Sequence, residues 1–219
     1  MMTVMRKDVF QCALVEAVGT FLLALAVFQS GEPLAVGLIL MAALYLGTHA
    51  HVPFLNTAVG FAAFFNKKID LNAFVVTSVA QVIGALGAGM LSARMSNAVP
   101  VLPMRGLPMH MGLAEAIATF VFVMVVMTMV SNIDRLKNSD LYGLVIGLTA
   151  TGLIYVTKGL AFFNPAIALG IMLHNYMVIV PEEGVAVIEM PHLAIFVIVP
   201  FIGSVLAVWF YDYIQGMKK

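Results

Sequence analysis

The chain has 219 residues, of which 62% are hydrophobic and only 10% are charged, and its mean hydropathy is +1.04. A soluble domain carries about 25% charged residues, so this chain has more apolar surface than a water-soluble fold could bury. The net charge is zero and no basic run suggests nucleic acid as a partner. The composition therefore indicates a protein whose solvent is the lipid bilayer.

Six apolar stretches are candidates for membrane-spanning helices, which need about 20 residues each. The second and fifth are short, and reach a full span only by extending a turn into their flanks. Polar loops with turn-forming residues separate the stretches. The six stretches cover residues 9–28, 34–46, 73–91, 111–130, 141–156 and 193–213.

Two further apolar stretches, residues 56–65 and 164–173, are too short to cross a bilayer. A helix of about ten residues is about 15 Å long, half of the roughly 30 Å hydrocarbon core. Each stretch begins at an asparagine, which is a strong N-cap residue, and Pro165 occupies the favoured first helical position. We therefore expect two half-helices that begin near the middle of the membrane.

The distribution of lysine and arginine predicts the orientation. With a cytoplasmic N-terminus and six crossings, eight of these residues face the cytoplasm, and only Arg94, Arg105 and Lys158 face outward. This split follows the positive-inside rule. The sequence thus predicts an integral protein of the plasma membrane with both termini in the cytoplasm.

The two halves of the chain resemble each other at three places, in the same order. The segment around Glu16 aligns with that around Glu115, and Asn56 aligns with Asn164. A weaker match aligns residues 81–85 with residues 200–204. We therefore expect a single domain, residues 1–219, built from one repeat of about residues 9–92 and another of about residues 109–214.

Three spans in each half make the second repeat enter from the opposite side of the membrane, which is an inverted-topology repeat. The two half-helices then come from opposite faces and meet with their N-terminal ends. Irregular backbone at membrane depth is tolerated only where it is buried in protein or lines a wet cavity. This geometry predicts a central aqueous path.

These features resemble the major intrinsic proteins, the family of aquaporins and aquaglyceroporins, over nearly the whole chain. The resemblance implies an all-α membrane protein of six spanning helices and two re-entrant half-helices. It implies a passive channel for water and small uncharged solutes, which needs no cofactor. It also implies a homotetramer with one pore in each subunit. The residues that correspond to the pore motif are Asn56, Thr57, Ala58, Asn164, Pro165 and Ala166.

The sequence departs from the family pattern at two points. Thr57 stands where the first motif has proline, and Ile167 stands where an arginine usually follows the second. The other positions that resemble the selectivity filter are Val36, Gly152 and Ala161. A filter without charge favours solutes such as glycerol, urea or ammonia, as well as or instead of water.

Two alternatives for this filter stay open. Lys158 could swing into the pore mouth and restore a positive charge. An apolar constriction can also close by dewetting.

Two groups of ionisable residues have expected roles by resemblance. Glu16 and Glu115, which lie within spans, are expected to accept hydrogen bonds from the loops that precede the half-helices. His49 is expected at the cytoplasmic pore mouth, either as a packing residue or as a pH gate. His49 and His51 lack the carboxylates or cysteines that a metal site needs, so no metal is expected.

Two other functions are alternatives to a channel. A non-conducting or gated membrane scaffold with the same fold is favoured by the apolar filter and by Thr57. An intramembrane enzyme or a proton-coupled carrier would need a nucleophile with a base, or a relay of titratable groups. The sequence offers no such arrangement, so we expect a protein that is not an enzyme.

Overall fold

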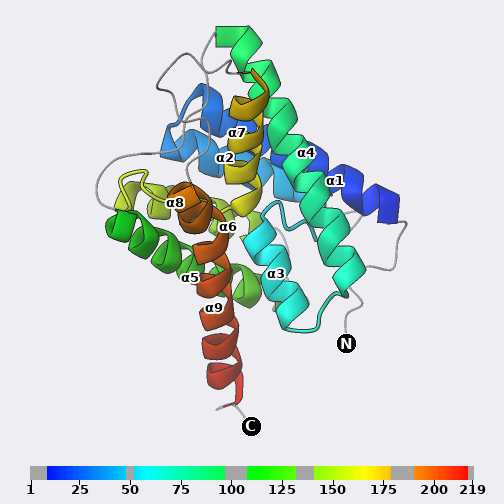
Figure 1. Cartoon of the computed structure of the whole chain (residues 1–219). Coiled ribbons are helices and arrows are strands. Elements are labelled where there is room, and N and C mark those ends of the chain that lie inside the picture. The colour runs from blue at the N-terminus through cyan, green and yellow to red at the C-terminus, as the bar shows by residue number, and fades with distance from the viewer. Residues whose placement is uncertain (1–8, 48–51, 97–107, 132–140, 179–189, 217–219) are drawn as a thin grey trace.

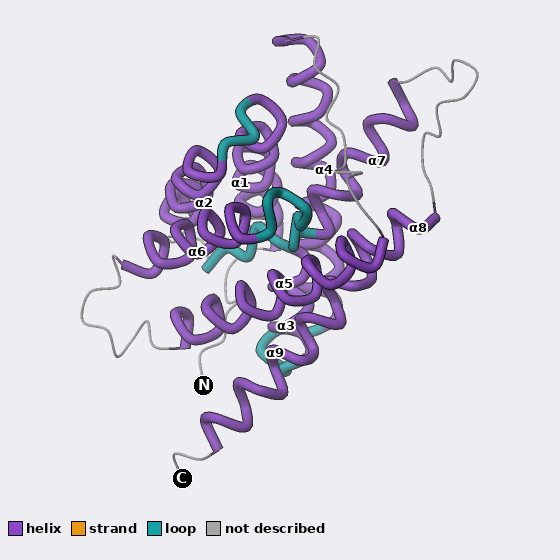
Figure 2. Tube along the Cα trace, turned by 90° about the vertical axis from the view of Figure 1, so that its left-hand side faces the viewer, coloured by secondary structure: helices purple, strands orange, loops and turns teal. Residues whose placement is uncertain are grey.

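The computed structural model describes residues 9–47, 52–96, 108–131, 141–178 and 190–216, which form helices joined by short turns and loops, with no strand among them. Two short helices, α3 (Thr57–Phe65) and α7 (Pro165–Val178), lie among longer ones (Figures 1 and 2). The all-α architecture expected from the sequence is confirmed. The longer helices are α1 (Val9–Gln29), α2 (Pro33–Gly47), α4 (Leu71–Ser96), α5 (Pro108–Ser131), α6 (Tyr142–Val156), and a C-terminal segment of α8 (Met190–Leu193), η2 (Ala194–Ile198) and α9 (Val199–Gly216).

Four of these segments are long and apolar enough to cross a membrane: α1, α4, α5 and the C-terminal segment. The helices α2 and α6 are also apolar but have 15 residues each. A helix of that length is about 22 Å long, which is less than a bilayer core of roughly 30 Å. The prediction of two short spans thus agrees with the described helices, whereas α4 exceeds its predicted range of 73–91 at both ends.

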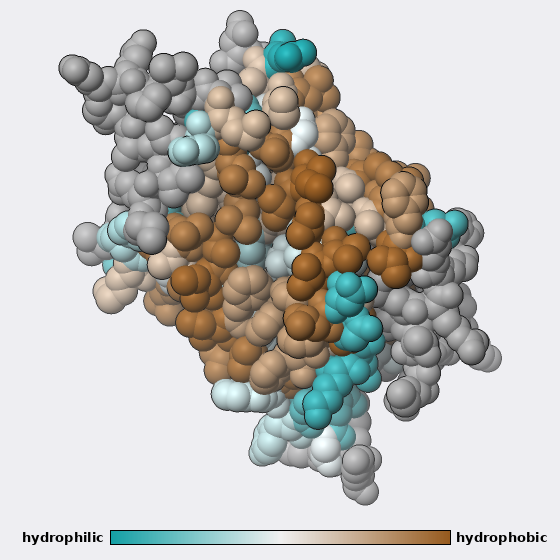
Figure 3. Space-filling view, turned by 45° about the vertical axis from the view of Figure 1, so that its right-hand side comes forward, coloured by the Kyte–Doolittle hydropathy of each residue, from teal (hydrophilic) through white to brown (hydrophobic). Residues whose placement is uncertain are grey.

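Large apolar side chains cover the outside of the bundle. Phe10, Ile83, Ile117 and Trp209, on four different helices, are each at least half exposed. Figure 3 shows apolar residues over most of the middle of one face, with hydrophilic residues gathered toward its edges. So large an apolar surface is not compatible with water, and it identifies an integral membrane protein.

The two halves build the same helix crossing. The helix α1 packs on α4, and α5 packs on α9. A Cβ atom on Gly84 would overlap the carbonyl of Ala17, and a Cβ on Gly203 would overlap the carbonyl of Ala116. These two pairs occupy equivalent positions in the aligned segments, so glycine permits the same close approach in both repeats.

A second close crossing joins the repeats to each other. A Cβ atom on Gly37 of α2 would overlap the carbonyl of Gly147 on α6, and a Cβ on Gly147 would overlap the carbonyl of Gly37. Thr151 adds a hydrogen bond from its hydroxyl to the carbonyl of Pro33, at 3.2 Å. The helices α2 and α6 therefore meet backbone to backbone through one reciprocal glycine pair.

The C-terminal segment departs from a regular α-helix just before a proline. The π-turn Ala194–Ile198 includes a hydrogen bond from the N–H of Val199 to the carbonyl of Ala194. Pro200 follows and has no N–H to continue an α-helical ladder. The wider turn ahead of it lets the segment continue into α9.

The half-helices meet in the interior. Figure 1 shows α7 and α3 with their N-terminal ends toward each other near the middle of the molecule. The helix α3 has 9 residues and α7 has 14, so α7 is longer than the ten-residue helix expected over 164–173. Its extra residues continue the helix beyond residue 173 and leave the position of its N-terminus unchanged.

Candidate functional site

Each half-helix is capped by its asparagine. Asn56 has extended backbone angles, and its Oδ1 accepts a hydrogen bond from the N–H of Ala58 at 2.8 Å. Asn164 accepts in the same way from the N–H of Ala166, at 3.2 Å. These bonds satisfy one of the N–H groups that a helix start leaves without an intrahelical partner. The oxygen of each side chain is thus turned toward its own helix, which directs the amide NH₂ outward.

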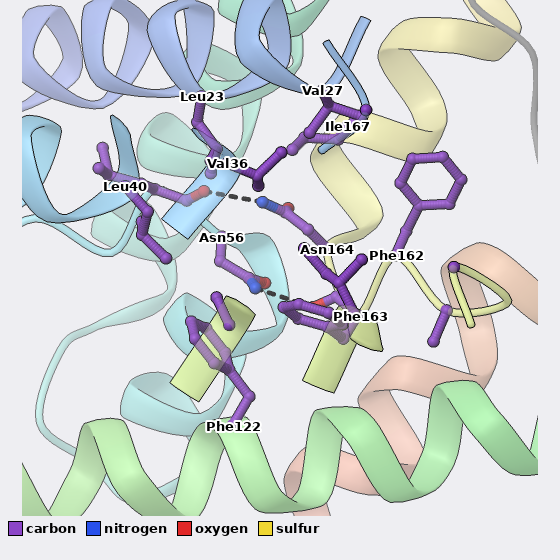
Figure 4. A pocket seen from close by; sticks show the side chains of 16 residues that line it. Leu23, Val27, Val36, Leu40, Asn56, Phe122, Phe162, Phe163, Asn164 and Ile167 are labelled. Carbon is purple, nitrogen blue, oxygen red and sulfur yellow. Dashed lines mark hydrogen bonds between the residues drawn. The ribbon is translucent and has the colours of Figure 1, made fainter. Parts of the chain in front are cut away.

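The two asparagines are tied across the junction of the repeats. Asn56 Nδ2 donates to the carbonyl of Phe163 at 2.8 Å, and Asn164 Nδ2 donates to the carbonyl of Leu55 at 2.9 Å (Figure 4). Each NH₂ carries two hydrogens, so one N–H of each asparagine remains beyond this bond. Both residues line the same cavity.

The residue before each asparagine has an unusual backbone conformation. Leu55 has φ of 53° and Phe163 has φ of 40°, in the left-handed region that bulky residues rarely adopt. Both side chains are buried, and both carbonyls accept the bonds from the opposite asparagine. Strain of this kind, of about 1–3 kcal/mol, persists where surrounding contacts over-determine the backbone, as they do here.

Two buried carboxylates hold the loops that carry these residues. Glu16 of α1 accepts from the N–H groups of Phe54 and Leu55, at 2.7 and 2.8 Å. In the second half, Glu115 of α5 accepts from the N–H groups of Phe162 and Phe163. Both acids are fully buried and neither lines the cavity. Their place in the structure is beside the loops, where they satisfy backbone donors that the bilayer could not.

Two hydrogen bonds with neighbouring helices hold the start of α3. They involve Gln81 and Ser204, for which the sequence predicted no role. The hydroxyl of Thr57 donates to Oε1 of Gln81 on α4, at 2.8 Å. The hydroxyl of Ser204 on α9 donates to the carbonyl of Ala58, at 2.9 Å. The sequence contained a signal for both, because Gln81 and Ser204 are polar residues inside apolar spans.

A cavity of about 240 Å³ adjoins the two asparagines. Among its described lining residues none is charged, and the amides of Asn56 and Asn164 are its polar side chains. The rest is aliphatic or aromatic, as Figure 4 shows. The other lining residues are Leu23, Val27, Gly31, Val36, Leu40, Leu55, Phe122, Ala150, Ile154, Gly159, Ala161, Phe162, Phe163 and Ile167.

The structure brings three of the four expected filter residues to this cavity. Val36, Ala161 and Ile167 line it, from α2, the loop before Asn164, and α7. Gly152 does not: it is exposed, and a Cβ atom there would meet nothing within 4 Å. The structure therefore does not place Gly152 among the residues that line this cavity.

The helix α6 contributes Ala150 and Ile154 instead. Residues four apart share one face of a helix, whereas Gly152, two residues along from either, points to the opposite side. Most of the other lining residues were not expected from the sequence, because an apolar side chain inside an apolar helix carries no signal of the face it occupies.

Of the two residues expected at the pore mouth, the structure describes only Lys158. Lys158 is exposed, follows the end of α6 with φ of 53°, and is not part of the cavity lining, although its neighbour Gly159 is. His49 lies outside the described residues. Within the described ranges, no three His, Cys, Asp or Glu side chains form a group suited to a metal ion.

A second cavity, of about 400 Å³, lies beside the loop that precedes Asn56. It is bordered by the loop residues Val52, Pro53 and Phe54, by α3 and the turn that follows it, and by the C-terminal parts of α5 and α9. Unlike the first cavity it includes charged residues, Lys68 and Asp212.

Half-helices that meet at their N-termini, beside an uncharged cavity inside a bundle of membrane helices, define a membrane channel. The family model for the major intrinsic proteins matches residues 29–211. The chain belongs to the major intrinsic protein family, and it is a channel protein rather than an enzyme.

Two similar proteins agree with this assignment. The chain is 31% identical over 216 residues to glycerol uptake facilitator protein-like 6 of Lactiplantibacillus plantarum, a match that covers 89% of this chain and 93% of the relative. Its fold is similar to that of the aquaglyceroporin from Plasmodium falciparum, with a TM-score of 0.78 and 21% identity. That likeness covers 95% of this chain and 97% of the other.

Proposed function

We propose that this protein is a passive channel for small uncharged solutes such as glycerol, urea or ammonia, as well as or instead of water. The observation that carries the proposal is the cavity in which two asparagine amides are surrounded by apolar side chains. An amide N–H offers a hydrogen bond to a hydroxyl, carbonyl or amine of the solute, and the apolar wall accommodates its carbon atoms. The glycerol uptake facilitator-like relative supports this choice of solute class.

We also expect the half-helices to exclude cations. Aligned peptide dipoles place about half a positive charge at the N-terminus of a helix, and α3 and α7 direct both such ends at one region. A cation there would lose its hydration shell and face two positive ends, in a cavity whose described lining has no carboxylate. The positive ends of half-helices are a known barrier to cations and protons in aquaporin-type pores.

We also propose that one chain, residues 1–219, forms a single channel domain made of the two repeats, and that four such chains assemble as a homotetramer. The exposed apolar residues on the outside of the bundle support contacts with lipid or with other subunits. The excess of lysine and arginine in loops assigned to the cytoplasm supports a plasma-membrane protein with both termini inside.

The test is stopped-flow light scattering on proteoliposomes with sucrose, glycerol and urea gradients. Glycerol or urea flux that is well above that of empty liposomes and rises linearly with the gradient supports a channel. Flux at the level of empty liposomes for every solute would reject the proposal and favour the alternative of a non-conducting scaffold. Saturable flux that follows a pH gradient would instead identify a coupled carrier.

A further inference from the structure

A chain of buried hydrogen bonds begins at the first residue of α3. Thr57 donates its hydroxyl hydrogen to Gln81 Oε1 at 2.8 Å, and Gln81 Nε2 donates to Glu16 Oε2 at 2.8 Å. Glu16 in turn accepts from the backbone of Phe54 and Leu55. Gln81 and Glu16 are fully buried and Thr57 is 5% exposed, so water does not compete for these bonds. Gln81 thus links the first residue of the helix to Glu16, the residue that holds the loop before it.

Among the described residues of the second half, this chain of bonds has no counterpart. Pro165 stands at the position of Thr57, and Pro200 aligns with Gln81. Neither proline has a side-chain polar atom, and Glu115 holds its loop through the N–H groups of Phe162 and Phe163. Proline at a first helical position fixes φ near −65° by its ring, whereas threonine leaves φ free. The start of α7 is therefore fixed by the ring of Pro165, whereas the start of α3 is fixed by the hydrogen bond from Thr57 to Gln81.

We propose that Gln81 is a positioning residue for the pore, which acts through Thr57 to fix the start of α3 and thereby the direction of the Asn56 amide. Thr57 and Gln81 together replace the proline that the second half-helix retains. The inference rests on the proposed channel function, because the amide of Asn56 matters only to a solute that passes it.

The proposal makes a specific statement about Thr57→Pro, the change that would give both half-helices the same Asn-Pro-Ala motif. Proline fits the backbone of a first helical position, but it has no donor for Gln81 Oε1. That oxygen would be left buried without a partner, a costly state in a protein interior. Thr57→Pro should therefore impair the channel, although it restores a commoner sequence.

The experiment compares Thr57→Ser, Thr57→Val, Thr57→Pro and Gln81→Met in proteoliposomes, with glycerol and water permeability measured on the same vesicles. Serine keeps the hydroxyl, so its permeabilities should stay within about twofold of the wild type, whereas the other three should lower glycerol flux about tenfold and alter the glycerol-to-water ratio. The control is Thr149→Val, which removes an exposed hydroxyl bonded only to the carbonyl of Val145 in its own helix.

A double variant and a second measurement separate positioning from folding. The loss of flux in the double variant Thr57→Val with Gln81→Met should equal that of Gln81→Met alone, because Gln81→Met already removes the Thr57–Gln81 bond along with the bond to Glu16. Additive losses, or a Thr57→Pro channel equal to the wild type, would overturn the proposal. If wild-type vesicles themselves show no flux, the proposed function fails. Thermal unfolding in detergent of the wild type, Thr57→Val, Gln81→Met and the double variant then tests the Thr57–Gln81 bond by itself. Additive shifts in Tm would reject a coupling between these two residues.

Discussion

Asn56 and Phe163 are joined across the two repeats by a hydrogen bond of 2.8 Å from the side-chain amide to the backbone carbonyl. The reciprocal bond, from Asn164 to Leu55, measures 2.9 Å. Each asparagine thus caps its own helix with oxygen and holds the opposite loop with nitrogen. Because each loop depends on the other half-helix, the pore centre forms only when both repeats are in place.

Replacing Asn164 by aspartate tests this reciprocal arrangement. The carboxylate cannot donate to the carbonyl of Leu55 and places a negative charge against that oxygen, and it also removes a donor from the cavity. Asn164→Asp should reduce glycerol flux about tenfold or more, the factor that corresponds to about 1.4 kcal/mol. Asn72→Asp, at an exposed position early in α4, is the matched control. Equal flux in the two variants would contradict a donor role for Asn164.

The identity of residue 167 should decide which solutes pass. Ile167 is 2% exposed and lines the cavity, so arginine there would narrow the path and add five N–H donors. Ile167→Arg should lower the ratio of glycerol to water permeability about tenfold, because the larger solute faces the greater barrier. Ile167→Leu conserves volume and should leave the ratio unchanged. A ratio that is the same in all three proteins would show that this position does not select the solute.

Lys158 offers a direct test of the alternative in which it supplies the missing positive charge. Its side chain is exposed and is not among the cavity residues. Lys158→Gln should therefore leave the glycerol-to-water ratio and the exclusion of sodium and potassium unchanged. A new cation current in planar bilayers on this substitution would instead show that the lysine reaches the pore.

Ala150 and Gly152 form a matched pair on one helix. Ala150 lines the cavity, whereas a side chain at Gly152 would meet open space. Ala150→Leu should reduce solute flux several-fold by filling the path, and Gly152→Leu should keep flux within about twofold, since lipid accommodates an added apolar side chain. The reverse outcome would return Gly152 to the filter and reject the placement of α6.

The reciprocal glycine contact should be a determinant of stability. A Cβ atom at Gly37 would overlap the carbonyl of Gly147, so Gly37→Ala must move two helix backbones apart. Overpacking of this kind costs about 1–3 kcal/mol, and the protein should unfold at a lower temperature in detergent. Gly152→Ala, where the added methyl group meets nothing within 4 Å, is the control and should change stability by less than about 1 kcal/mol. Equal Tm values for both variants would argue against the close crossing.

Gly152 shows where sequence reasoning reaches its limit. Its assignment to the filter depends on its spacing from Asn164, and that spacing holds only if the loop between them has the length usual in the family. In a soluble helix, the alternation of apolar and polar residues would have indicated the inner face. In a membrane helix, lipid and protein interior are equally apolar, so the pattern does not distinguish Ala150 from its neighbours.

The sequence by itself determined the bilayer as solvent, the two half-helices with their capping asparagines, and the repeat that relates Glu16 to Glu115. These follow from composition, from segment length and from local capping chemistry, all of which are properties of short stretches of chain. Only the tertiary structure decided which apolar residues line the cavity and that Gln81 holds Thr57. The physical reason is that both depend on how helices far apart in the chain rotate and pack, which local chemistry does not specify.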